Sequence, residues 1–197
     1  DGASKSAIAI ALAPILQACS DGSDNRLAES GASSYGPLAP VLDNTTGLPL
    51  LRLPAGFTYT SFGWTGDIMT DGTLTPDRHD GMAVVSGQGG AAGECVLIRN
   101  HERSVVAPGL PLPLIGGGIA PVYDNLVFPG VLAGLGGGTT AVRMRGGQLL
   151  EDTATLAGTI ANCAGGATPW GSWLTCEETI TLGSLIGAQD HGFVFEV

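Results

Sequence analysis

Glycine is the feature of this sequence that most limits its fold. The chain has 197 residues, of which 32 are Gly and 12 are Pro. Gly costs about 1 kcal/mol per helical position relative to Ala, and Pro costs about 3 kcal/mol, so long helices are disfavoured. These residues alternate with apolar runs and not with the Ser, Gln or Lys tracts that are typical of disorder. The pattern predicts an all-β chain with many turns.

Apolar or alternating runs of strand length begin near Leu48. Wide glycine-rich intervals separate them, as they do in diverged β-propeller blades. A blade takes about 40 to 50 residues, so residues 48–197 would hold about three blades, which makes an incomplete β-propeller. A β-sandwich is the alternative architecture. The predicted strands are 57–62, 82–86, 95–99, 139–144, 173–176 and 193–197, and helices are predicted only near 5–17 and 126–135.

The net charge of the chain limits the class of its partners. It carries 8 Lys and Arg against 18 Asp and Glu, a net charge of −10. Without a basic stripe that displaces counterions from phosphates, nucleic acid is not expected as a partner. An anionic substrate would be repelled at long range. Bound metal cations would then have to supply positive charge locally, and they would use the excess carboxylates.

The N-terminal residues have the pattern of an exported bacterial protein. An apolar run at 7–16 has about the length of a signal-peptide core and is too short to cross a bilayer. It ends before Cys19 in a pattern similar to a lipoprotein cleavage site, so a lipidated Cys19 is the possible membrane attachment; a short buried helix is the alternative. We expect a truncated export leader at 1–19, a polar linker at 20–47 and a folded part at 48–197, in a periplasmic or secreted protein.

Polar side chains stand beside two of the predicted strands. His79 and Asp80 precede one strand, and Asn100, His101 and Glu102 follow another. Side chains at strand ends can converge on one site. Asn100, His101 and Glu102 offer oxygen and imidazole ligands for a metal, whereas a turn or capping role is as plausible for His79 and Asp80. The spacing matches neither an HExxH nor a CxxC zinc signature.

The segment at 162–179, NCAGGATPWGSWLTCEET, concentrates thiols and carboxylates. Cys163 is predicted in a glycine-rich turn, where the backbone can approach an ion closely. Cys176 is in a predicted strand, followed by Glu177 and Glu178, which point to opposite faces if the strand stays extended. A thiolate beside carboxylates is a mixed soft and hard donor set that suits iron with calcium nearby. The alternative is a Cys163–Cys176 disulfide, worth about 3 kcal/mol.

Several of these motifs together resemble the PhoX family of secreted bacterial alkaline phosphatases. The resemblance rests on TGDIMTDGTLTPDRHDGMAVV, LIRNHE, GGGTT, NCAGGATPWGSWLTCEET and HGFVFEV, which keep the family's motif order from about Leu48 to the last residue. It implies a β-propeller, export through the twin-arginine route, and hydrolysis of phosphate monoesters by a cluster of iron and calcium ions. Small phosphate esters would be the substrates of such an enzyme, and a metal-bound oxide or hydroxide would attack the phosphorus.

The resemblance also implies roles for individual residues. Cys163 corresponds to the iron-binding cysteine, one or both of Glu177 and Glu178 correspond to metal-binding carboxylates, and Glu102 is the next metal ligand in order. The expected supporting residues are His101, Asn100, His79, Asp80 and Asn162. The family chain continues with further carboxylates and arginines from later blades. The sequence is therefore expected to be an N-terminal fragment that is inactive alone, from a protein that is monomeric at full length.

Two other classes of protein fit the same residues. A non-catalytic, metal-stabilised propeller that serves as an exported binding module would keep the motifs without hydrolysis, because a fold can outlive an activity. A structural β domain stapled by a Cys163–Cys176 disulfide would contain no iron. Metal content and phosphatase activity together separate the three classes.

Overall fold

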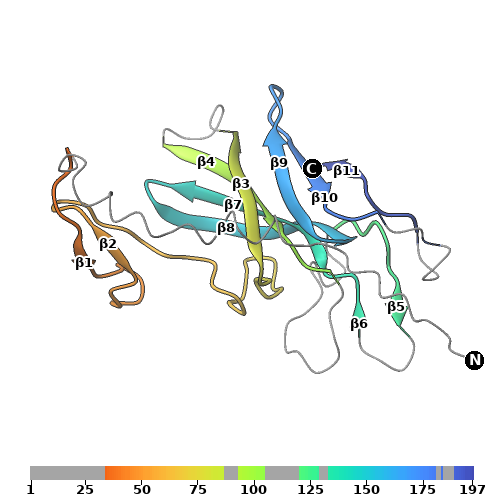
Figure 1. The fold of residues 1–197 in the computed structure, drawn as a ribbon, viewed down its shortest axis with the longest axis horizontal. Coiled ribbons are helices and arrows are strands. Elements are labelled where there is room, and N and C mark those ends of the chain that lie inside the picture. Colours follow the sequence, from red (N-terminus) through yellow and green to blue (C-terminus); the bar gives the residue numbers. More distant parts are fainter. Residues whose placement is uncertain (1–33, 87–92, 105–119, 129–132, 181–182, 184–188) are drawn as a thin grey trace, which may run out of the picture. The chain divides into compact units, whose positions relative to one another are not determined.

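The computed structural model describes residues 34–86, 93–104, 120–128, 133–180, 183 and 189–197 (Figure 1). The predicted leader and the predicted helix at 5–17 lie outside the described residues. The chain divides into two compact units, and the described parts of these are 34–43 with 47–59, and 44–46 with the residues from 60 onward. Each unit is considered by itself.

The smaller unit is a hairpin of two short antiparallel strands, β1 (Ala39–Val41) and β2 (Leu51–Leu53). The hydroxyl of Tyr59 ties the hairpin together, since it donates to the Val41 carbonyl at 3.1 Å and accepts from the Leu50 backbone N–H at 2.9 Å. β1 lies inside the stretch at 20–47 that was predicted as a polar linker, so residues 39–41 of that stretch are strand.

A four-stranded antiparallel sheet forms the centre of the larger unit, in the order β3-β4-β7-β8. Its strands are β3 (His79–Ser86), β4 (Glu94–His101), β7 (Gly137–Arg145) and β8 (Gln148–Thr159). The strands predicted at 82–86, 95–99 and 139–144 are confirmed. β8 was not predicted because its sequence, QLLEDTATLAGT, has no continuous apolar run, although Asp152, Ala154 and Leu156 alternate toward the buried face.

A three-stranded antiparallel sheet stands beside the first, in the order β11-β10-β9. Its strands are β9 (Asn162–Ala167), β10 (Trp173–Glu177) and β11 (Val194–Glu196). The chain passes from β8 to β9 through a sharp corner at Ala161, whose φ of 51° lies in the left-handed region. The strands predicted at 173–176 and 193–197 are confirmed, the second with shorter bounds.

Two predictions of secondary structure were wrong. The helix predicted at 126–135 is replaced, in its described residues, by the short antiparallel pair β5 (Val127–Phe128) and β6 (Ala133–Gly134). The strand predicted at 57–62 is irregular. Its apolar and β-branched residues satisfy the strand pattern, but they join the two units and pair with no neighbouring strand among the described residues.

The main core lies where the loop after β2 covers the four-stranded sheet. Met69 packs with Ala120, Ala154 and Ala157, and all four side chains are buried. The loop is held by side chains, since Thr70 donates its backbone N–H to the Asp152 carboxylate at 2.8 Å. This leaves the opposite part of the sheet, at the β3 edge, to meet β9.

The architecture is all-β, as expected. The described sheets have two, three, four and two strands, and none of them closes on itself. The propeller therefore stays a prediction. Within the described part of the chain, no helix has the length and apolarity needed to cross a membrane.

Candidate functional site

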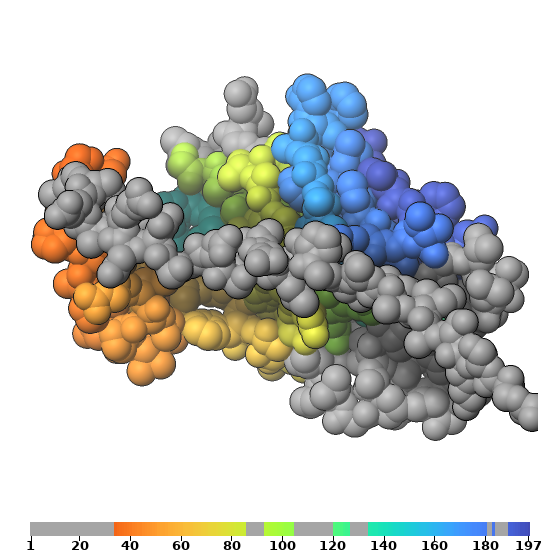
Figure 2. Space-filling view, viewed as in Figure 1, coloured from red at the N-terminus to blue at the C-terminus, as the bar shows by residue number. Residues whose placement is uncertain are grey.

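The junction between the two larger sheets carries most of the predicted site residues. β9 rises beside the edge strand β3 in Figure 1, and Figure 2 shows their side chains abutting on one face. The approach is close because Gly81 in β3 has no side chain: a Cβ there would lie 2.6 Å from the Cys163 carbonyl oxygen. Glycine at this position lets β3 bring its neighbouring residues, including Asp80, against β9.

A β-bulge shapes β9 at Cys163. Thr175 pairs with Gly165 and Glu177 pairs with Asn162, so Cys163 and Ala164 together oppose the single residue Cys176. The prediction that Cys163 lies in a turn was wrong, because the glycine-rich sequence that follows it is part of a bulged strand. The bulge re-aims the residues around it, which is the common use of this device next to active sites.

Asn100 fastens the bulge to the four-stranded sheet. Its side-chain amide donates to the carbonyls of Cys163 and Ala164 at 3.1 and 3.0 Å. Its carbonyl oxygen accepts from the Trp173 indole and from the Thr175 hydroxyl, each at 2.9 Å. The side chain is fully buried, with all four hydrogen bonds made. Asn100 therefore positions the Cys163 segment and has no capacity left for a metal.

Cys163 at this junction is half-buried, and Glu178 and Asp80 near it are exposed. Burial raises the pKa of the Cys163 thiol, and the neighbouring Glu178 and Asp80 carboxylates raise that pKa further, while the Ala164 backbone N–H acts in the opposite direction. Two negative charges disfavour a thiolate beside them. A cation bound among these groups would reverse that effect, since it favours the thiolate and screens the carboxylates.

Glu177 points the opposite way, into the protein. Its carboxylate accepts the backbone N–H of Ile160 at 2.8 Å, of Gly192 at 2.7 Å and of Phe193 at 3.1 Å. The imidazole Nδ1 of His191 contacts it at 2.6 Å. These four donors occupy both carboxylate oxygens. The role of Glu177 as a metal ligand stays a prediction.

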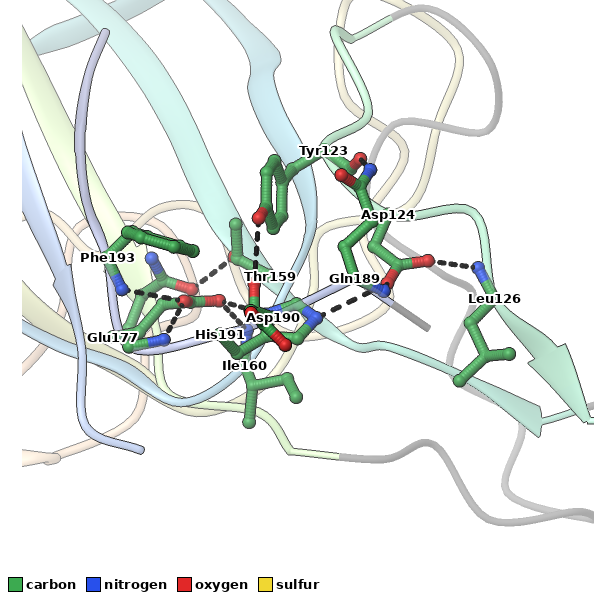
Figure 3. Close-up of polar contacts among 12 residues, drawn as sticks. Tyr123, Asp124, Leu126, Thr159, Ile160, Glu177, Gln189, Asp190, His191 and Phe193 are labelled. Carbon is green, nitrogen blue, oxygen red and sulfur yellow. Dashed lines mark hydrogen bonds and ion pairs between the residues drawn. The ribbon is translucent and has the colours of Figure 1, made fainter. Parts of the chain in front are cut away.

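The contact with His191 extends into a buried network that the sequence reasoning missed (Figure 3). The His191 ring lies between the Glu177 and Asp124 carboxylates, with Nε2 at 3.4 Å from Asp124, and its side chain is fully buried. Asp124 accepts the backbone N–H of Leu126 and of Gln189 at 2.8 and 2.7 Å. In the sequence, only the His191-Gly192 pair before β11 pointed to this network. The network joins three separate segments behind the junction.

His101 and His79 are stacked edge to face, with ring centroids 5.2 Å apart. His101 is fully buried, and burial lowers its pKa to about 3 against the weaker, opposite effect of a backbone hydrogen bond to Asp77. The neutral ring contacts the Asp77 carbonyl through Nδ1 and the Thr140 hydroxyl through Nε2. Burial, and then the Arg99 guanidinium, also lower the pKa of His79, which contacts the Pro76 carbonyl. Both imidazoles therefore support the strand ends.

The last two predicted residues have different surroundings. Asn162 is buried and donates to the Thr175 hydroxyl at 3.0 Å, so it supports the bulge from the inner face. Glu102 follows β4 and is half-buried, and its backbone N–H donates to the Arg78 carbonyl at 2.9 Å. Its carboxylate has no hydrogen-bond partner within the described ranges.

The donors at the junction suit a metal by their chemistry but are not arranged as a metal site by themselves. A thiol with two carboxylates combines the soft ligand that iron accepts with the oxygen ligands that calcium requires. Among the described residues, however, no group of three or more His, Cys, Asp or Glu side chains is arranged to hold an ion. By themselves, Cys163, Glu178 and Asp80 do not form such a group.

The fold and the site together define an all-β protein with thiol and carboxylate donors at a sheet junction. The family model described as alkaline phosphatase PhoX matches residues 33–108 and 129–197, which include every residue of that junction. The chain belongs to the PhoX family of alkaline phosphatases. The searches of curated proteins and of solved structures found no match.

Proposed function

We propose that this chain forms part of a metal-dependent phosphatase that hydrolyses phosphate monoesters with iron and calcium. The observation that carries the proposal is the close approach of β3 to β9 at Gly81 and Cys163, which brings the Asp80 carboxylate near the Cys163 thiol, with Glu178 also acting on it. Family membership supports phosphate-ester hydrolysis as the reaction class. The acidic composition supports it as well, because a chain of net charge −10 needs cations to attract an anionic ester.

In this proposal the residues of the junction bind the metal ions and hold the metal-binding segment in place. Cys163 is the thiolate ligand of iron, and Glu178 and Asp80 supply oxygen ligands to the same cluster. Asn100 holds the Cys163 backbone in place through its two carbonyl contacts. When bound, such cations neutralise the charge of the ester and polarise its phosphoryl oxygens. Glu178 is preferred over Glu177 as the carboxylate ligand, because four protein donors already hold Glu177.

The natural gene product can be tested for metal content and for hydrolysis of p-nitrophenyl phosphate with calcium present. Cys163→Ala should lose iron and lower kcat/KM by at least about 10²-fold, because the substitution removes a side chain that binds the metal directly. Glu178→Gln should lower both metal content and activity without loss of folding. Cys95→Ala is the matched control, since Cys95 is also a half-buried free thiol in a strand but lies at the far end of β4 from Asn100.

Unchanged iron content and activity in Cys163→Ala would contradict the proposal. Metal uptake with no hydrolysis of any phosphoester would instead support the exported binding module. Activity that survives a chelator for calcium and iron would exclude the metal-dependent reading altogether.

A further inference from the structure

Two free cysteines occupy opposed positions of β9 and β10 at the bulge. Cys163 and Cys176 are both free and both half-buried. The pairing on either side leaves Cys176 as the one residue of β10 that opposes Cys163 and Ala164. Opposed residues in an antiparallel ladder have Cα atoms about 4.5 to 5.5 Å apart. Disulfides need Cα atoms about 4.4 to 6.8 Å apart, a range that includes regular opposed pairs, and the register shift between Thr175 and Glu177 places both Cys163 and Ala164 opposite Cys176.

The two side chains also share a face of the sheet. In β10, Trp173, Thr175 and Glu177 are buried, whereas Leu174 and Cys176 between them are half-exposed. Cys176 therefore points outward by strand alternation. Cys163 points outward as well, because it follows the fully buried Asn162 in β9 and is itself half-buried. In a bulge, the two residues of the bulged strand turn toward the face of their single partner.

We propose that Cys163 and Cys176 form a reversible disulfide, which removes the Cys163 thiolate as a possible ligand. Cys95 takes no part, since it lies at the far end of β4. The closed loop would run from 163 to 176 through the turn between β9 and β10. The turn is already fixed by the Thr168 backbone N–H, which donates to the Ser172 carbonyl at 2.9 Å, so the bond adds a link within an existing hairpin.

The oxidant is an external disulfide, of a small thiol or of a protein. One cysteine thiolate attacks a sulfur of this disulfide, which forms a mixed disulfide and releases one thiol. The second cysteine thiolate attacks the protein sulfur of the mixed disulfide and releases the second thiol. Two protein thiols are oxidised, one external disulfide is reduced, and the two thiol protons leave as the thiolates form. Excess external thiol reverses the exchange.

The consequence for metal binding rests on the proposed function. A sulfur in a disulfide is no longer a thiolate ligand, so oxidation removes the soft donor from the Cys163, Glu178 and Asp80 set. Metal and disulfide would then exclude each other at Cys163. The carboxylates would remain, which leaves oxygen donors only.

Peptide mapping of the whole gene product tests the disulfide directly. Metal-free protein is equilibrated with mixtures of reduced and oxidised glutathione, the remaining thiols are alkylated, and non-reduced peptides are analysed by mass spectrometry. The expected result is a linked pair of peptides that contains Cys163 and Cys176, with a loss of two hydrogens and with Cys95 alkylated. Cys176→Ser should instead leave one glutathione on Cys163, and Cys95→Ser should keep the linked pair.

Absence of the linked pair at every glutathione ratio, with Cys163 and Cys176 modified independently in the wild-type protein, would overturn the inference. The metal consequence is read separately, by loading the protein with Zn²⁺ before oxidation. Zn²⁺ should suppress the linked pair, whereas undiminished linkage in zinc-loaded protein would refute mutual exclusion. If the linked peptides are absent while iron content and hydrolysis are normal, the disulfide is rejected and the phosphatase proposal stands. If the linked peptides form but the protein has neither iron nor hydrolysis, the phosphatase proposal alone is rejected.

Discussion

Two adjacent carboxylates have opposite environments in this chain. Glu177 is buried among four protein donors, and Glu178 is exposed near Cys163. Their chemistry is identical, so the difference comes from position: Glu177 is the last residue of β10 and is buried, whereas Glu178 follows the strand and is exposed. Glu177 stabilises the fold and Glu178 is available for a ligand, which makes the pair a natural internal control.

Glu177→Gln should lower the free energy of unfolding by about 3 kcal/mol, because an amide group replaces a buried carboxylate whose partners are donors. Glu178→Gln should change it by less than about 0.5 kcal/mol in metal-free protein, as exposed substitutions usually do. Urea unfolding of both variants measures the difference. Equal effects of the two substitutions would contradict the assignment of Glu177 to the fold.

His101 should make the stability of the metal-free protein depend on pH. Its pKa is lowered from an ordinary 6.5 to about 3 in the folded state, so the unfolded chain binds the proton more tightly. Stability is then lost as the pH falls from about 6.5 toward 3. Between pH 7 and pH 5 the loss due to His101 is about 2 kcal/mol.

Urea unfolding at pH 7 and pH 5, compared between the wild type and His101→Gln, isolates this contribution. The variant should be less stable at pH 7, because it loses a buried ring, and its pH dependence should be smaller by about 2 kcal/mol. His79→Gln is the control, since the more exposed His79 ring should affect the slope less. If the free energy of unfolding had the same pH dependence in the wild type and His101→Gln, the claim that His101 is neutral in the folded protein would be wrong.

At the scale of elements, the hairpin of β9 and β10 depends on two neighbouring glycines that differ in surroundings. A Cβ at Gly165 would overlap the Leu174 carbonyl oxygen and the Trp173 indole. A Cβ at Gly166 would meet nothing within 4 Å. Trp173 packs over Gly165 and donates its indole N–H to Asn100, so this close packing also fastens the hairpin to β4.

Gly165→Ala should therefore destabilise the protein by about 1 to 3 kcal/mol through overpacking. Gly166→Ala should change stability by no more than about 0.5 kcal/mol. Thermal unfolding of the two variants measures the contrast, and Trp fluorescence reports whether the indole has moved. Similar melting temperatures for both variants would mean that the Trp173 packing does not hold the hairpin.

At the scale of the molecule, the site exists because two sheets meet. β4 supplies Asn100, β3 supplies Gly81 and Asp80, and the β9–β10 hairpin supplies Cys163 and Glu178. No single strand carries the donor set. In the proposed function, cations at the junction would offset the net charge of −10 close to the Cys163 thiol and its neighbouring carboxylates.

Local patterns were sufficient for much of this protein. The density of glycine and proline, with apolar runs between them, was enough to predict an all-β chain. The free-energy cost of placing Gly or Pro in a helix is paid at each residue and does not depend on tertiary contacts. The motifs around Cys163 and Glu178 were enough to point to the PhoX family. β8 escaped prediction because it has no continuous apolar run and its buried face includes the polar Asp152. The helix predicted at 126–135 failed because its apolar residues also suit short strands.

Long-range pairing decided the rest. The bulge that opposes Cys163 to Cys176, the burial of Glu177 beside His191, and the approach of Asp80 to Cys163 all join residues that are distant in the sequence or change face within one strand. Such contacts depend on strand register, and a shift of one residue reverses which face a side chain occupies. The amino-acid sequence thus specified the donors and the family, and the packing of the two sheets specified which donors meet.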